Sequence, residues 1–254
     1  MNNILAIAKN TFRETIRDKV LYGIVGFAVL FLISTIFISA LSLGEDVKVV
    51  RDLGLAGIYV FTILITIFLG TPLISKELEK RTIYIILSKP VSTLQFILGK
   101  ALGLLLGISL NLSIMTVLYL AIVLFKGGGF DGVAMFSILL LLFEVILFIS
   151  LTILFSTFTT PLAGTIYSVI ILYTGHSLSM LKTASIESGN IFSKALGSAA
   201  YYLFPNLEKF NLRNTVVYGN IPSAGQIIYP IIYALCFSVI LLWLANIALK
   251  KQDL

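Results

Sequence analysis

The sequence predicts an all-α integral membrane protein, because of its composition, the length of its apolar runs and their continuity. Of its 254 residues, 58% are hydrophobic and 12% are charged, whereas a soluble domain carries roughly 25% charged residues. Apolar runs of about 20 residues, the length that crosses the hydrocarbon core as a helix, recur along the whole chain. The strands of a membrane barrel would alternate apolar and polar residues, and these runs do not. We therefore expect a single transmembrane domain over residues 1–254.

Six membrane-spanning helices are predicted, and one interfacial helix precedes them. The predicted spans cover residues 20–43, 53–74, 101–125, 133–158, 161–181 and 227–249. In the predicted interfacial or elbow helix, residues 2–18, apolar side chains including Phe12 recur every four positions, while Lys9, Arg13 and Arg17 form a row on another face. Such a helix lies with its apolar face in the membrane and its cations toward anionic headgroups. A cleaved signal peptide is the competing interpretation of the first apolar run.

The connections between the spans carry further predictions. The dipeptide 159–160 and Pro161 predict a tight turn and antiparallel fourth and fifth spans, because proline is tolerated at the first helical position. The long segment 182–226 contains an aromatic cluster that suits the membrane–water boundary, so we expect short interfacial or re-entrant helices on the external side. Gly103 and Gly107 form a small-x-x-x-small pair, which predicts close helix packing within the subunit.

The distribution of lysine and arginine predicts the orientation. With the N-terminus inside, eleven of these residues fall on the cytoplasmic side and seven on the other, and cytoplasmic loops are enriched in them. We expect a multi-pass protein of the cell membrane (inner or plasma membrane) with both termini in the cytoplasm. The net charge of +6 is thus explained by topology and by contact with the lipid bilayer. Nucleic acid is not an expected partner, because the basic residues lie between apolar spans and do not form a patch.

The cytoplasmic connection from Pro72 to Lys100 is charged in its first half and apolar in its second. Thr82 is a suitable N-cap for a short helix over residues 83–88, which Pro90 would end. A short apolar helix exposed in the cytoplasm needs a surface that buries it. The segment therefore predicts contact with a partner protein.

This layout resembles the permease subunits of type-2 ABC transporters. The motif that carries the resemblance is Glu77, then Thr82, an apolar stretch, Pro90, and the dipeptide Gly99–Lys100 at the start of the third span. The chain looks most similar to the small permeases grouped with copper-enzyme maturation and with drug and bacteriocin exporters. In that family a glycine usually precedes the threonine, whereas this chain has arginine there.

The resemblance implies the membrane subunit of an ATP-driven exporter, which is not itself an enzyme. It implies that segment 77–90 is a coupling helix seated in a groove of a separate ABC ATPase. The residues expected to form this contact are Glu77, Thr82, Ile83, Ile85, Ile86, Leu87 and Pro90. Because the phosphate-binding pattern G-x-x-x-x-G-K-[ST] is absent from the sequence, ATP and Mg²⁺ are expected on two copies of the partner ATPase, and no cofactor is expected on this chain. A second permease subunit, identical or related, is also implied, since six spans make half of the usual permease.

Two ionisable residues, Glu144 and His176, lie within the predicted fourth and fifth spans. Charged groups in the membrane are costly and mark functional candidates. At 1.5 Å per residue, the two side chains could approach each other across antiparallel helices. Glu144 could simply fix helix packing, or it could be the titrating group of an ion- or proton-coupled carrier, which is the alternative function. No catalytic residue or metal site is expected, because the patterns H-E-x-x-H and G-x-S-x-G are absent.

Overall fold

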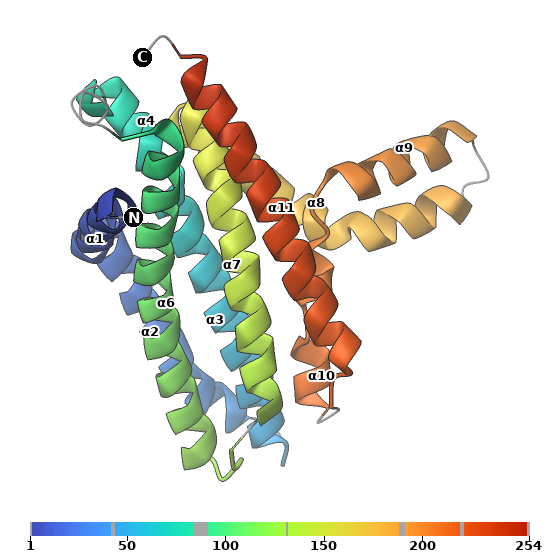
Figure 1. Cartoon of the computed structure of the whole chain (residues 1–254). Coiled ribbons are helices and arrows are strands. Elements are labelled where there is room, and N and C mark those ends of the chain that lie inside the picture. The colour runs from blue at the N-terminus through green and yellow to red at the C-terminus, as the bar shows by residue number, and fades with distance from the viewer. Residues whose placement is uncertain are drawn as a thin grey trace.

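The computed structural model describes residues 2–41, 44–83, 91–130, 132–187, 191–218 and 221–252. Within these ranges all regular secondary structure is helical, which confirms the predicted all-α fold (Figure 1). The elements are α1 (Asn2–Arg17), α2 (Lys19–Ser39), α3 (Asp46–Gly70), α4 (Pro72–Glu79), α6 (Thr93–Phe125), α7 (Gly132–Phe158), α8 (Pro161–Glu187), α9 (Ile191–Leu203), the 3₁₀ turn η1 (Leu207–Phe210), α10 (Arg213–Val217) and α11 (Ala224–Lys250).

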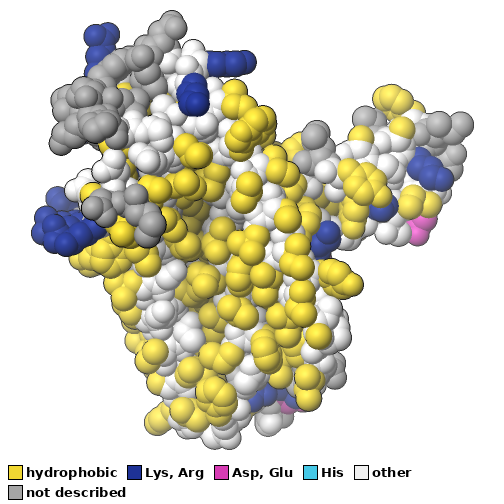
Figure 2. All heavy atoms as spheres, viewed as in Figure 1, with side chains coloured by type: hydrophobic (Ala, Val, Ile, Leu, Met, Phe, Trp, Pro, Cys, Tyr) yellow, Lys and Arg dark blue, Asp and Glu magenta, His cyan; other side chains and the backbone are white. Residues whose placement is uncertain are grey.

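Among the described residues, five helices are long and apolar enough to cross a membrane: α2, α3 taken together with α4, α6, α7 and α11. Helix α7 lies at the centre of the bundle, packed against α3, α6, α8 and α11. Large apolar side chains such as Phe27, Val117 and Val239 are exposed on the outside, and Figure 2 shows hydrophobic side chains over most of the visible bundle face. Helix α8, which contains the predicted fifth span, is not one of the five, so the count of six spans stays a prediction.

Helix α1 packs along α6 because three glycines, spaced four residues apart on α6, remove the side chains between them. A Cβ atom at Gly103 would lie 2.5 Å from the carbonyl oxygen of Ala8, and one at Gly107 would lie 2.5 Å from the methyl of Thr15. At Gly99 the nearest atoms belong to Ile7, at 2.7 Å. The glycine pair thus serves packing within the subunit, as predicted.

Helices α3 and α4 are separated by a break at Pro72. Proline cannot donate a backbone hydrogen bond, and it is tolerated at the first position of a new helix. The backbone N–H groups of Ile74 and Ser75 donate to the hydroxyl of Ser156 on α7, at 2.8 and 2.9 Å. This hydroxyl satisfies two donors at the start of α4 that have no partner within the helix. The start of α4 is therefore fixed to the central helix.

Helix α1, helix α4 and the last turns of α11 lie toward one end of the bundle, while α10 and the connection between α6 and α7 lie toward the other end (Figure 1). That the two termini share a side of the membrane stays a prediction. Most of the Lys and Arg side chains visible in Figure 2 gather near α1 and α4 or on the α8–α9 arm. The cytoplasmic assignment of that end stays a prediction.

Helices α8 and α9 form an arm that projects from the side of the bundle (Figure 1). The predicted tight turn before α8 is present, since α7 ends at Phe158 and α8 begins at Pro161. Within the arm, the ammonium group of Lys182 lies 4.0 Å from the centre of the Tyr201 ring, a favourable cation–π distance. The long segment before α11 is thus structured by α9, η1 and α10, as expected. Its depth in the membrane stays a prediction.

Candidate functional site

A buried lysine joins three helices where α1, α4 and α6 meet. The side chain of Lys100 on α6 is 2% exposed, and its Nζ lies 2.5 Å from Oε1 of Glu77 on α4. The same Nζ lies 3.6 Å from Oε2 of Glu14 on α1. A buried ammonium group needs a paired carboxylate, and Glu77, at 19% exposure, supplies the closer and less hydrated one. A displacement of α4 must therefore break this pair or move α6 with it.

The local sequence places both members of the pair. Helix α6 begins at Thr93, where Ser92 and Gln95 form a capping box in which each side chain binds the other residue's backbone N–H. Lys100 therefore lies two turns inside a capped helix rather than at the edge of a span. After α4 ends, the hydroxyl of Thr82 donates to the carbonyl oxygen of Glu77 at 3.4 Å. This hydrogen bond fixes the turn after α4, and the ion pair of Glu77 with Lys100 holds that turn against α6.

Arg81 follows α4 with a φ of 56°, which lies in the left-handed region that glycine occupies at little cost. The family that the sequence resembles usually has glycine at this position, and the left-handed conformation gives a physical reason for it. For a residue with a Cβ atom the conformation costs about 1–2 kcal/mol.

We expect Arg81→Gly to raise the thermal unfolding temperature of the purified chain and Arg81→Val to lower it, because a β-branched residue fits this conformation poorly. Equal stability of the two variants would contradict the strain.

The remaining residues of the predicted coupling segment have different outcomes. Ile83 is fully buried in the chain's own core, so the expectation that a partner protein must bury this side chain is wrong: the chain itself encloses it. Ile85, Ile86, Leu87 and Pro90 lie outside the described residues. Their contact with a partner stays a prediction.

The predicted elbow helix has the expected faces. Lys9, Arg13 and Arg17 are exposed, and Phe12 is half-buried. Ala8, however, packs against Gly103 of α6, so part of the face assigned to the membrane contacts protein. The reason is that the glycines of α6 have no side chains, so the backbone of α1 packs directly against α6 at this face. The attraction of the three cations to headgroups stays a prediction.

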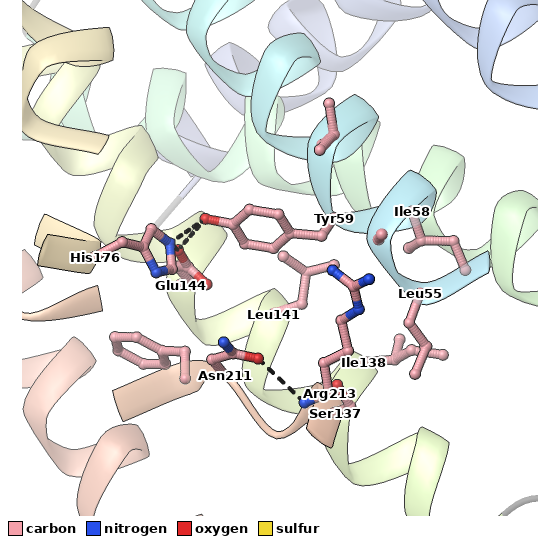
Figure 3. A pocket seen from close by; sticks show the side chains of 13 residues that line it. Leu55, Ile58, Tyr59, Ser137, Ile138, Leu141, Glu144, His176, Asn211 and Arg213 are labelled. Carbon is pink, nitrogen blue, oxygen red and sulfur yellow. Dashed lines mark hydrogen bonds and ion pairs between the residues drawn. The ribbon is translucent and has the colours of Figure 1, made fainter. Parts of the chain in front are cut away.

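A second cluster of polar side chains lies inside the bundle, and it contains both intramembrane candidates. The hydroxyl of Tyr59 on α3 donates to Oε1 of Glu144 on α7 at 3.0 Å and lies 2.5 Å from Nε2 of His176 on α8. Nδ1 of His176 lies 3.0 Å from Oε2 of Glu208 on η1. Figure 3 shows Tyr59, Glu144 and His176 pointing toward one another. The structure thus brings Glu144 and His176 together, with 3.6 Å between Oε1 and Nε2.

Exposure rises along this chain of hydrogen bonds. The side chain of Glu144 is 2% exposed, that of His176 is 27% exposed and that of Glu208 is 45% exposed. Hydrogen-bonded groups therefore connect a carboxylate in the bundle interior with one at the surface. No group of three or more His, Cys, Asp or Glu side chains suited to hold a metal ion is present in the described ranges.

A cavity of about 230 Å³ opens beside Glu144. Its walls come from α3, α7, His176 of α8, and the segment from η1 to α10. Arg213 lies at its rim, where Nε is 2.5 Å from Oδ1 of Asp52, and the backbone N–H of Arg213 donates to Asn211. The cavity therefore combines apolar walls with a small number of fixed polar groups, which is the usual character of a ligand site.

Sequence reasoning missed Tyr59, Glu208 and Glu14, and it quoted Lys100 without giving it a partner. For Lys100 a signal existed: a lysine that opens a run of apolar residues needs a nearby acid, and Glu77 and Glu14 were available. For Tyr59 and Glu208 no local pattern exists. Their role depends on the way η1 folds back over α7 and α8.

No curated protein matches the sequence. The sequence model of a family described as ABC-2 family transporter protein matches residues 5–254. This match extends over α1, the membrane helices, the charged cluster around Lys100 and the polar cavity. The chain therefore belongs to the ABC-2 transporter family, whose members are the membrane-spanning permease components of ABC transporters.

Proposed function

We propose that this chain is the permease subunit of an ATP-driven exporter and that segment 77–90 couples it to a separate ABC ATPase. The observation that carries the proposal is the ion pair between Glu77 and the buried Lys100. Glu77 stands at the beginning of the segment, and Lys100 stands inside α6, against which α1 is packed. A force applied to the segment by a partner is therefore transmitted directly to three elements of the bundle.

The break at Pro72 supports the same proposal. Helix α4 is short, and its start is held by Ser156 of the central helix α7, while its end is held through Glu77 by α6. A short helix with fixed contacts at both ends moves as a rigid unit. Rotation of α4 against α7 would change how α3 and α6 pack, and such changes of packing open and close transport pathways.

The proposal includes the partners that family members generally need. The ATPase supplies the nucleotide site, and ATP and Mg²⁺ bind there. We expect two ATPase copies and two permease subunits, identical or related, in the assembled transporter. Both termini and segment 77–90 face the cytoplasm in this arrangement, where ATP is available.

Aspartate substitutions in segment 77–90 test the coupling. Burying an apolar side chain in a groove of the ATPase contributes roughly 1.5 to 3 kcal/mol to binding. A carboxylate placed in that groove instead adds a desolvation cost. We expect Ile85→Asp and Leu87→Asp each to weaken ATPase binding by about tenfold to a hundredfold. Expression and membrane insertion should remain normal. The measurement is the amount of ATPase that co-purifies with each variant, together with ATP hydrolysis in reconstituted vesicles.

Ile221→Asp is the matched control, because Ile221 is exposed and lies between α10 and α11, away from α4. It should co-purify the ATPase like the unmodified chain. Unchanged binding and hydrolysis in both segment variants would exclude segment 77–90 as the coupling element.

One observation favours the alternative of an ion- or proton-coupled carrier. It is the chain of hydrogen bonds that runs from Glu144 to Glu208. The two functions differ in their energy source. Transport that continues after ATP depletion and stops on addition of a protonophore would support the carrier. Transport that stops on ATP depletion and persists with the protonophore would support the ABC function.

A further inference from the structure

The cavity beside Glu144 is mostly apolar. Its walls include Leu55 and Ile58 of α3, Leu141 of α7 and Phe210 of η1. A dry cavity of about 150 Å³ lined by such side chains binds benzene, and this cavity has a volume of about 230 Å³. Water fills an apolar space poorly, because each buried water needs about two to four polar partners. The space therefore suits an organic molecule somewhat larger than benzene.

A carboxylate oxygen of Glu144 faces this cavity without a hydrogen bond. Oε1 accepts the proton of the Tyr59 hydroxyl, whereas Oε2 has no hydrogen bond within the described ranges. Oε2 is not one of the fully enclosed polar atoms either. Because the side chain of Glu144 is 2% exposed and lines the cavity, the accessible surface of Oε2 lies at the cavity wall. A buried acceptor in this position calls for a donor from a bound molecule.

The charges at the polar end of the cavity, formed by Glu144, Tyr59 and His176 (Figure 3), balance each other. Tyr59 has a single hydroxyl proton and donates it to Glu144, so Nε2 of His176 donates to the Tyr59 oxygen. Nδ1 donates to the carboxylate of Glu208, and the ring is therefore positively charged. This charge lies 3.6 Å from Oε1 of Glu144 and offsets it. Glu208 does not line the cavity.

The remaining ionisable group of the wall, Arg213, also has its own partner. Its Nε lies 2.5 Å from Oδ1 of Asp52. A cation or an anion that entered the cavity would thus lose its hydration without meeting an unpaired opposite charge, which is costly in apolar surroundings. An uncharged molecule has no such cost. The wall therefore favours a neutral ligand.

From this geometry we propose that the cavity binds a small uncharged amphipathic molecule that carries a hydrogen-bond donor such as a hydroxyl group. The donor binds Oε2 of Glu144, and the apolar body lies along α3 and α7. A carboxylate oxygen accepts hydrogen bonds but does not donate them, so the site distinguishes a hydroxyl group from an ether oxygen. The site is formed by this chain alone. It goes beyond the proposed coupling and does not depend on it.

Calorimetric titration of the purified full-length chain in lipid nanodiscs, without an ATPase, tests the proposal. The probes are 2-phenylethanol and its methyl ether, which has the same apolar body but no donor. Empty nanodiscs give the background from partition into lipid. We expect saturable binding of the alcohol and about 5- to 150-fold weaker binding of the ether, which corresponds to the cost of about 1–3 kcal/mol for an unsatisfied buried polar group. Equal affinity for the two, or no saturable binding of the alcohol, would overturn the proposal.

Two charged analogues test whether the site is neutral. The cation 2-phenylethylammonium and the anion phenylacetate are close to the alcohol in size. Both should bind more weakly than the alcohol, because neither meets an unpaired opposite charge in the cavity. If either ion bound as tightly as the alcohol, or more tightly, the site would not be one for an uncharged ligand.

Two variants separate the hydrogen bond from the space. In Glu144→Gln the amide oxygen accepts from Tyr59 and the amide N–H₂ faces the cavity, so the preference for the alcohol over the ether should be lost. Ser137→Phe, which fills the cavity from α7, should weaken binding of both probes. Ser113→Phe, on the exposed surface of α6, is the matched control and should bind like the unmodified chain.

Retained preference for the alcohol in a folded Glu144→Gln variant would contradict the assignment of Oε2. Unchanged binding in Ser137→Phe would place the alcohol outside the cavity and would also overturn the proposal. If the Glu144→Gln variant does not fold, the comparison of alcohol and ether on the unmodified chain decides the matter.

Discussion

Replacing Lys100 with methionine is expected to destabilise the protein by about 3 kcal/mol and to abolish stimulation of the partner's ATP hydrolysis. Methionine has a similar length and is apolar, so packing against Phe96 is kept, but Glu77 loses its only ammonium partner within 4 Å among the described residues. Removing one member of a buried ion pair costs about 3–5 kcal/mol. The lower end applies here, because Glu77 is 19% exposed and keeps some hydration. The stability change is measured by thermal unfolding.

A second substitution separates stability from coupling. Removing both charges of a buried pair is often neutral, so Glu77→Gln in the Lys100→Met background should recover most of the lost stability. ATPase stimulation should stay absent, because the charged link between α4 and α6 is missing. Lys250→Met changes an exposed lysine and should alter neither property. Recovery of full stimulation in the double variant would show that the ion pair serves stability alone.

Substitution of Gly103 is the other change with a large expected effect. A Cβ atom there would lie 2.5 Å from both the carbonyl oxygen of Ala8 and the Cβ of Thr11, far inside normal contact distance, and the carbonyl belongs to the rigid backbone of α1. Overpacking of this kind costs about 1–3 kcal/mol. We expect Gly103→Ala to destabilise the chain by this amount, and Gly103→Leu to separate α1 from α6.

The control is Gly26 in α2, where nothing lies within 4 Å of an added Cβ. Gly26→Ala should be neutral or stabilising by about 0.4–1 kcal/mol, since alanine loses less backbone entropy in a helix. Tryptic cleavage after Arg13 and Arg17 reports whether α1 has detached. Equal tryptic resistance of Gly103→Leu and the unmodified chain would contradict the packing of α1 along α6.

Much of the fold was predictable from residue patterns alone. The elbow helix and Pro161 at the start of α8 were found because amphipathic spacing and proline act locally. The start of α6 at Thr93 was missed by eight residues, since the prediction began where the apolar run begins and gave no weight to the capping box at Ser92 and Gln95. The second capping box, at Ser223 and Gln226, is a similar missed signal.

The candidate sites were less predictable, because they depend on contacts between distant parts of the chain. The sequence identified Glu144 and His176 as unusual. Tyr59, which joins them, lies 85 positions before Glu144 in the chain, so no local pattern connects the three residues. Glu208 reaches His176 only because η1 folds back onto the bundle, where Leu207 packs closely against Gly175. Ile83 shows the opposite error: an apolar side chain in a charged connection was assigned to a partner, whereas the chain buries it itself.

The central claim, that segment 77–90 contacts a separate ATPase, is tested most directly by site-specific photocrosslinking in native membranes. A photoreactive amino acid at Leu87 should form a crosslink to a protein that contains a phosphate-binding loop, identified by mass spectrometry. The same amino acid at Ile221, between α10 and α11, should not crosslink to that protein. Crosslinks from Leu87 only to lipid or to the permease itself would contradict the account.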